Sequence, residues 1–194
     1  MPGYKELYEY CQTLEPKISR NDILNKAIEL TGVGTIKCTK TALDITKMRG
    51  FFLSVGNTQH SLVRVFGTNL IVLARGMNEC WDRFITVKEV MHLFDRHNET
   101  TGTAEAFDRL LSDFELLKPA QGPSPQYSSE LRSIWMALGC LCPEKLRLEF
   151  VDQFNKGHID HYGIALKLKI PQQHVKYLLN DSFKPIIDTI LVMP

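Results

Sequence analysis

Apolar residues recur every three or four positions along most of this chain, and this spacing is typical of helices that bury one face. We predict such helices over residues 2–15, 20–30, 83–94, 103–117, 130–141 and 143–155. Residues 159–179 then show a helix-turn-helix rhythm, with Lys169-Ile-Pro171 as the turn. The helical pattern therefore predicts a largely helical C-terminal half.

A different pattern occupies residues 35–74. Short segments rich in β-branched and aromatic residues are separated there by Gly and Asn, as is typical of strands joined by turns. We assign strands to residues 35–38, 49–56, 61–66 and 69–74. Residues 70–73 are all apolar, so we expect the last strand to be buried on both faces. The segment predicts a small, mainly antiparallel sheet.

Composition and length fit one globular unit. The chain has 194 residues, of which 44% are hydrophobic and 23% are charged. A chain of this length can form one domain with its own core. We expect a compact α+β domain in two parts. Residues 1–125 hold the first helices, the sheet and a motif helix, and residues 126–194 are helical.

Net charge and cysteine content indicate which partners and which compartment this protein has. The net charge of +1 gives no electrostatic case for nucleic acid or an acidic membrane surface. No apolar run approaches the roughly 20 residues that span a bilayer, and the N-terminus has no signal-peptide core. Cysteines are odd in number and irregularly spaced, so we expect free thiols. These features predict a reduced, cytoplasmic protein without a membrane partner.

The strongest chemical signal lies in residues 83–94. Glu89 and His92 are three positions apart, so both can lie on one side of a helix. In a helical His-Glu-x-x-His motif, two histidines bind zinc and the glutamate activates the zinc-bound water. Lys88 occupies the first histidine position here. Since a protonated lysine has no acceptor, it cannot ligate zinc.

A further ligand is expected from a later helix, because a hydrolytic zinc site needs about three protein ligands. Glu130 is the candidate, at the start of a long apolar helix that we expect Ser128 or Ser129 to cap. Glu89 would be the general base, and His92 and Glu130 would be metal ligands.

These residues resemble the ImmA/IrrE-type metallopeptidases of bacteria and their mobile elements. That family has a small sheet, then Arg-Phe-x-x-x-His-Glu-x-x-His, then a helix of the form Glu-x-x-Ala-x-x-Phe-Ala-x-x-Leu-Leu-x-Pro, then a helix-turn-helix-like tail. Residues 83–92 match the first motif except at Lys88, residues 130–143 match the second with Ser, Met and Cys for Ala, Phe and the first Leu, and residues 164–178 match the tail. The resemblance implies an α+β, zincin-like fold.

A second register of the same resemblance places Leu116-Leu-Lys-Pro119 on the family's Leu-Leu-x-Pro. It puts Ala106 where the glutamate belongs, although Glu105 and Asp108 lie nearby. We prefer Glu130, and we interpret residues 98–127 as an insertion.

The resemblance implies that the Lys88 ammonium lies where the family holds its metal, facing Glu89 and Glu130. Attraction of about 4 kcal/mol per close pair at a partly exposed site, before desolvation, makes this replacement plausible. We therefore expect a pseudo-metallopeptidase that needs no cofactor. It would act as a bacterial or prophage-derived regulator by binding a protein, such as a transcriptional regulator, since family members engage repressors.

Two other interpretations of the motif stay open. In the first, a substitute ligand such as His97, Asp95 or Asp108 keeps zinc bound, and the protein is an active zinc endopeptidase that cleaves a transcriptional regulator. In the second, Lys88 and Glu89 are solvated surface charges and His92 is an ordinary helix histidine.

The tail supports a third hypothesis, a DNA-binding regulator. Gln172, Gln173, His174 and Lys176 could contact base edges or phosphates from the second helix of the tail. Few lysines accompany them and the chain is nearly neutral, which argues against nucleic acid as a partner. The resemblance implies instead that this segment is a structural part of the fold.

Overall fold

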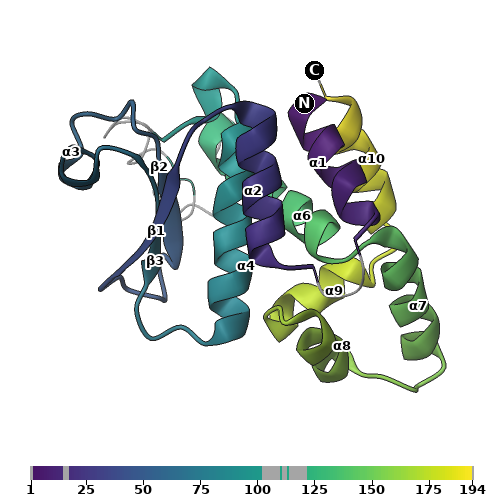
Figure 1. Cartoon of the computed structure of the whole chain (residues 1–194). Helices are drawn as coiled ribbons and strands as arrows, with labels where there is room; N and C mark the ends of the chain where they lie inside the picture. Colours follow the sequence, from purple (N-terminus) through teal and green to yellow (C-terminus); the bar gives the residue numbers. More distant parts are fainter. Residues whose placement is uncertain (1, 15–17, 102–109, 111–112, 114–121, 194) are drawn as a thin grey trace.

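The computed structural model describes residues 2–14, 18–101, 110, 113 and 122–193. Figure 1 shows a small sheet with helix α4 against one side of it, α2 beside α4, and α3 at the outer side of the sheet. The helices α1 and α6 to α10 lie beyond α4 and α2. The fold is α+β and mostly helical. The predicted helix over residues 103–117 falls almost entirely outside the described residues, as do Glu105, Ala106, Asp108 and Leu116-Leu-Lys-Pro119.

The first two helices follow the predicted pattern. Helix α1 spans Pro2–Gln12 and α2 spans Arg20–Thr31. The Ser19 hydroxyl accepts a hydrogen bond from the backbone N–H of Asn21, and Gly32 ends the helix at a φ of 63°. Both boundaries of α2 therefore follow from capping chemistry that is visible in the sequence.

The sheet is mixed, so the prediction of a mainly antiparallel sheet was wrong. Strands β1 (Ile36–Thr41), β2 (Gly50–Leu53) and β3 (Asn69–Ala74) form a three-stranded sheet in the order β1-β3-β2. β1 runs parallel to β3, whereas β2 runs antiparallel to it. Every residue of β3 is buried, as predicted from its continuous apolar run.

Residues 61–66 are a helix, which corrects the predicted strand there. Helix α3 spans Ser61–Phe66 and lies between β2 and β3 in sequence. The His60 side chain accepts a hydrogen bond from Leu62 N–H at its start, and Gly67 adopts a φ of 61° at its end. Val63 packs with Leu53, Leu70 and other buried side chains of the sheet. Local capping thus outweighs the β-propensity of this short segment.

The motif helix α4 spans Glu79–Val90 and continues as the 3₁₀ helix η1, Met91–Phe94. Asn78 caps its start by accepting from Trp81 N–H. The helix packs closely on the sheet at Gly50, where an added Cβ would lie 2.6 Å from Ile85 Cγ2. A second short 3₁₀ helix, η2 (His97–Glu99), follows. This packing brings one face of α4 next to β2.

Helix α6 spans Pro125–Leu141 and packs on both α1 and α4. Ser124 caps it through Tyr127 N–H, so the prediction of Ser128 or Ser129 as the cap was wrong. Glu130 lies in the second turn and not at the start.

The C-terminal helices are α7 (Glu144–Asn155), α8 (His161–Leu168), η3 (Gln172–His174), α9 (Val175–Leu178) and α10 (Phe183–Val192). α10 lies beside α1, so the two ends of the chain are neighbours (Figure 1). Tyr4, Val87, Met136 and Ile187 belong to one buried cluster, so both predicted parts share a core. Within the described ranges, no helix is long and apolar enough to span a membrane.

Candidate functional site

Lys88 lies buried between two carboxylates, with 8% of its surface exposed. Its Nζ is 3.0 Å from Glu89 Oε1, and it also donates a hydrogen bond to Glu130 Oε2. Glu89 comes from α4 and Glu130 from α6, so the ammonium links two helices. The prediction that Lys88 lies between Glu89 and Glu130 is confirmed, and the interpretation of Lys88 and Glu89 as solvated surface charges was wrong.

At Lys88 and Glu130, the neighbouring opposite charges shift the pKa more than burial does. Burial alone would lower the pKa of the Lys88 ammonium, but the carboxylates of Glu130 and Glu89 raise it above its ordinary value. Burial alone would raise the pKa of Glu130, but Lys88 and His92 hold it well below its usual range. Both groups are therefore charged at neutral pH, and Lys88 is not available as a neutral ligand.

His92 faces the same two carboxylates from η1. Its Nε2 lies 3.3 Å from Glu130 Oε1 and 3.6 Å from Glu89 Oε2. Its Nδ1 lies 2.7 Å from Asp95 Oδ2. Burial and Lys88 lower the pKa of His92, but Glu130 and Asp95 outweigh them and raise it to about 10. The imidazole is thus a second cation at neutral pH, and both of its nitrogens carry protons.

A second group of side chains lies behind His92, and of its members only Asp95 was named from the sequence as a candidate site residue. Asp95 accepts hydrogen bonds from Ser129 Oγ at 2.6 Å and from Arg132 at 3.1 Å. Arg132 also pairs with both carboxylate oxygens of Glu99, at 2.7 and 2.8 Å. Arg132 follows Glu130 by two positions and Asp95 follows His92 by three, so the signal was present in the spacing. This group fixes the ring of His92.

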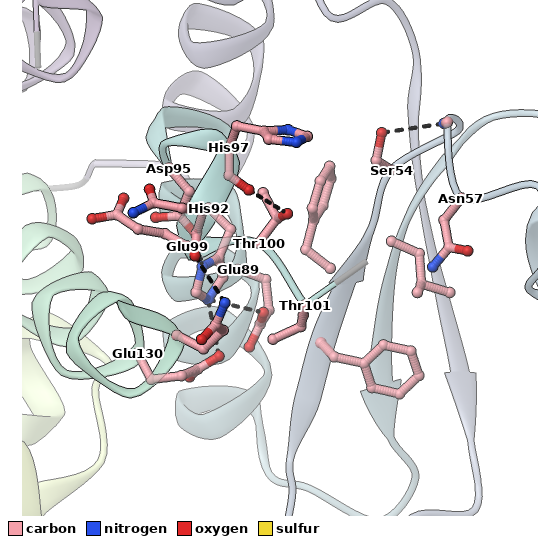
Figure 2. A pocket seen from close by; sticks show the side chains of 16 residues that line it. Ser54, Asn57, Glu89, His92, Asp95, His97, Glu99, Thr100, Thr101 and Glu130 are labelled. Atoms are coloured by element: carbon pink, nitrogen blue, oxygen red, sulfur yellow. Dashed lines mark hydrogen bonds and ion pairs between the residues drawn. The ribbon is translucent and has the colours of Figure 1, made fainter. Parts of the chain in front are cut away.

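These side chains line one wall of a pocket of about 660 Å³, the size of many small-ligand sites. Figure 2 shows Glu89, His92 and Glu130 on one side of it, and Ser54 and Asn57 on the other. The pocket lies between β2, the segment from His92 to Thr101, and the start of α6. Its lining residues are Phe51, Phe52, Leu53, Ser54, Gly56, Asn57, Glu89, His92, Asp95, His97, Asn98, Glu99, Thr100, Thr101, Gln126 and Glu130.

The donors around Lys88 do not fit a zinc ion. The ammonium donates to Glu130, the expected carboxylate ligand, and to Glu89, the would-be general base, and His92 carries a proton on Nε2. In the described part of the chain, no group of three or more His, Cys, Asp or Glu side chains is arranged to hold a metal. Of the proposed substitute ligands, Asp95 binds the far nitrogen of His92, His97 is exposed at the pocket, and Asp108 lies outside the described residues.

Comparison with known proteins gives no family for this chain. No protein-family model, curated protein or solved structure matches it. The ImmA/IrrE resemblance therefore stays a prediction that rests on the residues quoted above.

The predicted recognition segment of the tail is short. After α8, residues 172–178 form η3 and the four-residue α9. Gln172, Gln173 and Lys176 are exposed, as a nucleic-acid contact would require. His174 is buried and stacks on Phe84, with ring centroids 4.1 Å apart, so it belongs to the core. The segment packs against α4 and does not present a long free helix.

Proposed function

We propose that this protein is an ImmA/IrrE-like pseudo-metallopeptidase, a bacterial or prophage-derived regulator that acts by binding another protein. The observation that carries the proposal is the position of the Lys88 ammonium between Glu89 and Glu130. In a zinc peptidase of this kind, a divalent cation would neutralise these carboxylates. Here the chain supplies the positive charge from its own helix.

The charge state of His92 also supports the proposal. A zinc ligand must offer a neutral imidazole nitrogen, and a general base must be able to accept a proton. The pKa of about 10 keeps His92 protonated in the physiological range. Glu89, the would-be general base, binds Lys88 through Oε1. The groups that hydrolysis needs are therefore engaged in ion pairs, while the pocket beside them stays large enough for a ligand.

Metal analysis of protein purified without chelator tests this proposal. We expect the wild-type chain to contain far less than one zinc per molecule. We expect Lys88→His, which restores the family motif, to gain about one zinc, while Lys88→Met gains none. Stoichiometric zinc in the wild-type protein that disappears in His92→Ala would refute the pseudoenzyme and favour the active endopeptidase. Failure of Lys88→His to gain zinc would refute the proposed correspondence with the family motif.

A further inference from the structure

Two buried acceptor atoms of residues that line the pocket have no hydrogen-bond partner among the described residues: Glu89 Oε2 and Gln126 Oε1. The residues that carry them are only 1% and 9% exposed. The cation next to Glu89 Oε2 is His92, whose Nε2 lies 3.6 Å away, beyond hydrogen-bond distance. The amide of Gln126 is oriented by its Nε2, which donates to Asn98 C=O at 2.8 Å, so Oε1 must point elsewhere. Buried acceptors without donors are rare and costly in folded proteins. Both atoms call for a ligand that donates hydrogen bonds.

The pocket surface is also acidic. Its lining includes the carboxylates of Glu89, Asp95, Glu99 and Glu130, and it includes no lysine or arginine among the described residues. Lys88 and Arg132 reach these carboxylates from outside the lining. One cation, His92, also lines the pocket, where it contacts Glu130 and Asp95. Lys88, His92 and Arg132 together carry three positive charges against the four carboxylates, so the group keeps one net negative charge. A donor that enters this pocket is best matched if it is a cation.

The opposite wall suits an extended polypeptide. Phe51, Phe52 and Leu53 of β2 line it. β2 is an edge of the sheet, because it pairs with β3 on one side and with no other described strand. The outer side of an edge strand offers backbone N–H and C=O groups that an incoming strand can pair with. Apolar side chains on this wall can also cover the aliphatic stem of a basic residue.

We propose that the pocket recognises a basic side chain, arginine in the first place, on an extended segment of the partner protein. The guanidinium donates to Glu89 Oε2 and Gln126 Oε1, and its fork of five donors can serve two separate acceptors at once. The flanking backbone of the segment lies along β2. This inference rests on the proposed function as a protein-binding regulator, and it names the chemistry of the partner that the pocket accepts.

The test compares two synthetic peptides, acetyl-Val-Arg-Val-amide and acetyl-Val-citrulline-Val-amide, titrated into ¹⁵N-labelled protein and followed by NMR. Citrulline keeps the shape of arginine but lacks its charge. We expect the arginine peptide to bind about tenfold more tightly, to weaken as salt is added, and to shift the side-chain amide of Gln126. Equal binding of both peptides, or no shift with either at about 1 mM, overturns the proposal. Agmatine that binds as tightly as the arginine peptide overturns the assignment to a polypeptide.

Variants locate the site. Gln126→Leu removes one acceptor and should weaken the arginine peptide about tenfold, with little effect on the citrulline peptide. Gln173→Leu, at an exposed glutamine outside this pocket, is the matched control and should change neither affinity. An unchanged affinity of Gln126→Leu for the arginine peptide refutes the assignment of the site. If this variant does not fold, the comparison of the two peptides with the wild-type protein still tests the proposal. Stoichiometric zinc in the wild-type protein would refute the proposed pseudoenzyme, but it would not change the comparison between the arginine and citrulline peptides. Failure of the proposed function and failure of this inference are therefore distinguishable.

Discussion

Replacing Lys88 by methionine removes the buried ammonium while keeping a side chain of similar length. The Nζ lies 3.0 Å from Glu89 Oε1, so at an effective dielectric constant of about 20 the attraction in this pair alone is about 5.5 kcal/mol. Desolvation of the charges offsets part of that energy, but removing Lys88 leaves two buried carboxylates that share a single neighbouring cation, His92. We therefore expect Lys88→Met to lower the free energy of unfolding by about 3–5 kcal/mol.

Urea unfolding followed by circular dichroism measures this loss. The matched control is Lys156→Met, because Lys156 pairs with Asp152 at 2.8 Å with side chains 58% and 62% exposed. At that solvated pair we expect less than about 1 kcal/mol. A loss in Lys88→Met no larger than in the control would refute the electrostatic reasoning. Adding Glu130→Gln to Lys88→Met should recover part of the loss, since it removes one of the two carboxylates that then share the single cation His92.

Three further predictions concern the elements around the site. Burial, Arg49 and Lys176 lower the pKa of His174 from 6.5 to about 4. The neutral imidazole therefore contributes its full stabilisation above about pH 6.5, and this contribution is lost as the pH falls through 4. That loss should reach about 3 kcal/mol, and urea titrations at several pH values should show it vanish in His174→Phe. Ser124→Ala removes the cap of α6 and should cost about 1 kcal/mol in urea unfolding, whereas an equal cost in Ser128→Ala would contradict the assigned cap. Gly50→Ala places a Cβ 2.6 Å from a side-chain carbon of α4 and should cost about 1–3 kcal/mol, so an unchanged thermal midpoint would contradict this packing.

Where the sequence predicted the structure correctly, one physical signal dominated. The apolar run of β3 has one simple structural solution, which is burial on both faces of the sheet. The pairing of Lys88 with Glu130 was also predictable, although the two residues are 42 positions apart. It followed from the matching order of the motifs and from the need of buried carboxylates for a cation.

The errors arose where local signals compete. Residues 61–66 combine β-branched residues with a capping residue before them and a glycine after them, and at this length the caps decide. Without a strand there, β1 and β3 become neighbours, and their parallel pairing follows from tertiary packing that periodicity does not encode. At α6, Ser124 precedes a proline at the first helical position, a start signal that outranks the later serines. The role of Arg132 depends on which face of α6 meets η1, which only the assembled structure determines.

The Lys88 ammonium joins helices α4 and α6, whereas other side chains of the same cluster face the pocket. Helices α4 and α6 each bring a carboxylate to their contact, and two such groups repel unless a cation lies between them. Lys88 supplies that cation from α4 itself, so the contact between the helices needs nothing from outside the chain. Lys88 is not part of the pocket lining, so the pocket meets the two carboxylates on the side where His92 is their neighbouring cation. A Lys88→His variant should reverse this independence: zinc should raise its thermal midpoint and a chelator should lower it, while neither reagent changes the wild-type protein. Equal responses of both proteins to zinc would show that the stability of this helix contact does not depend on the charge at position 88.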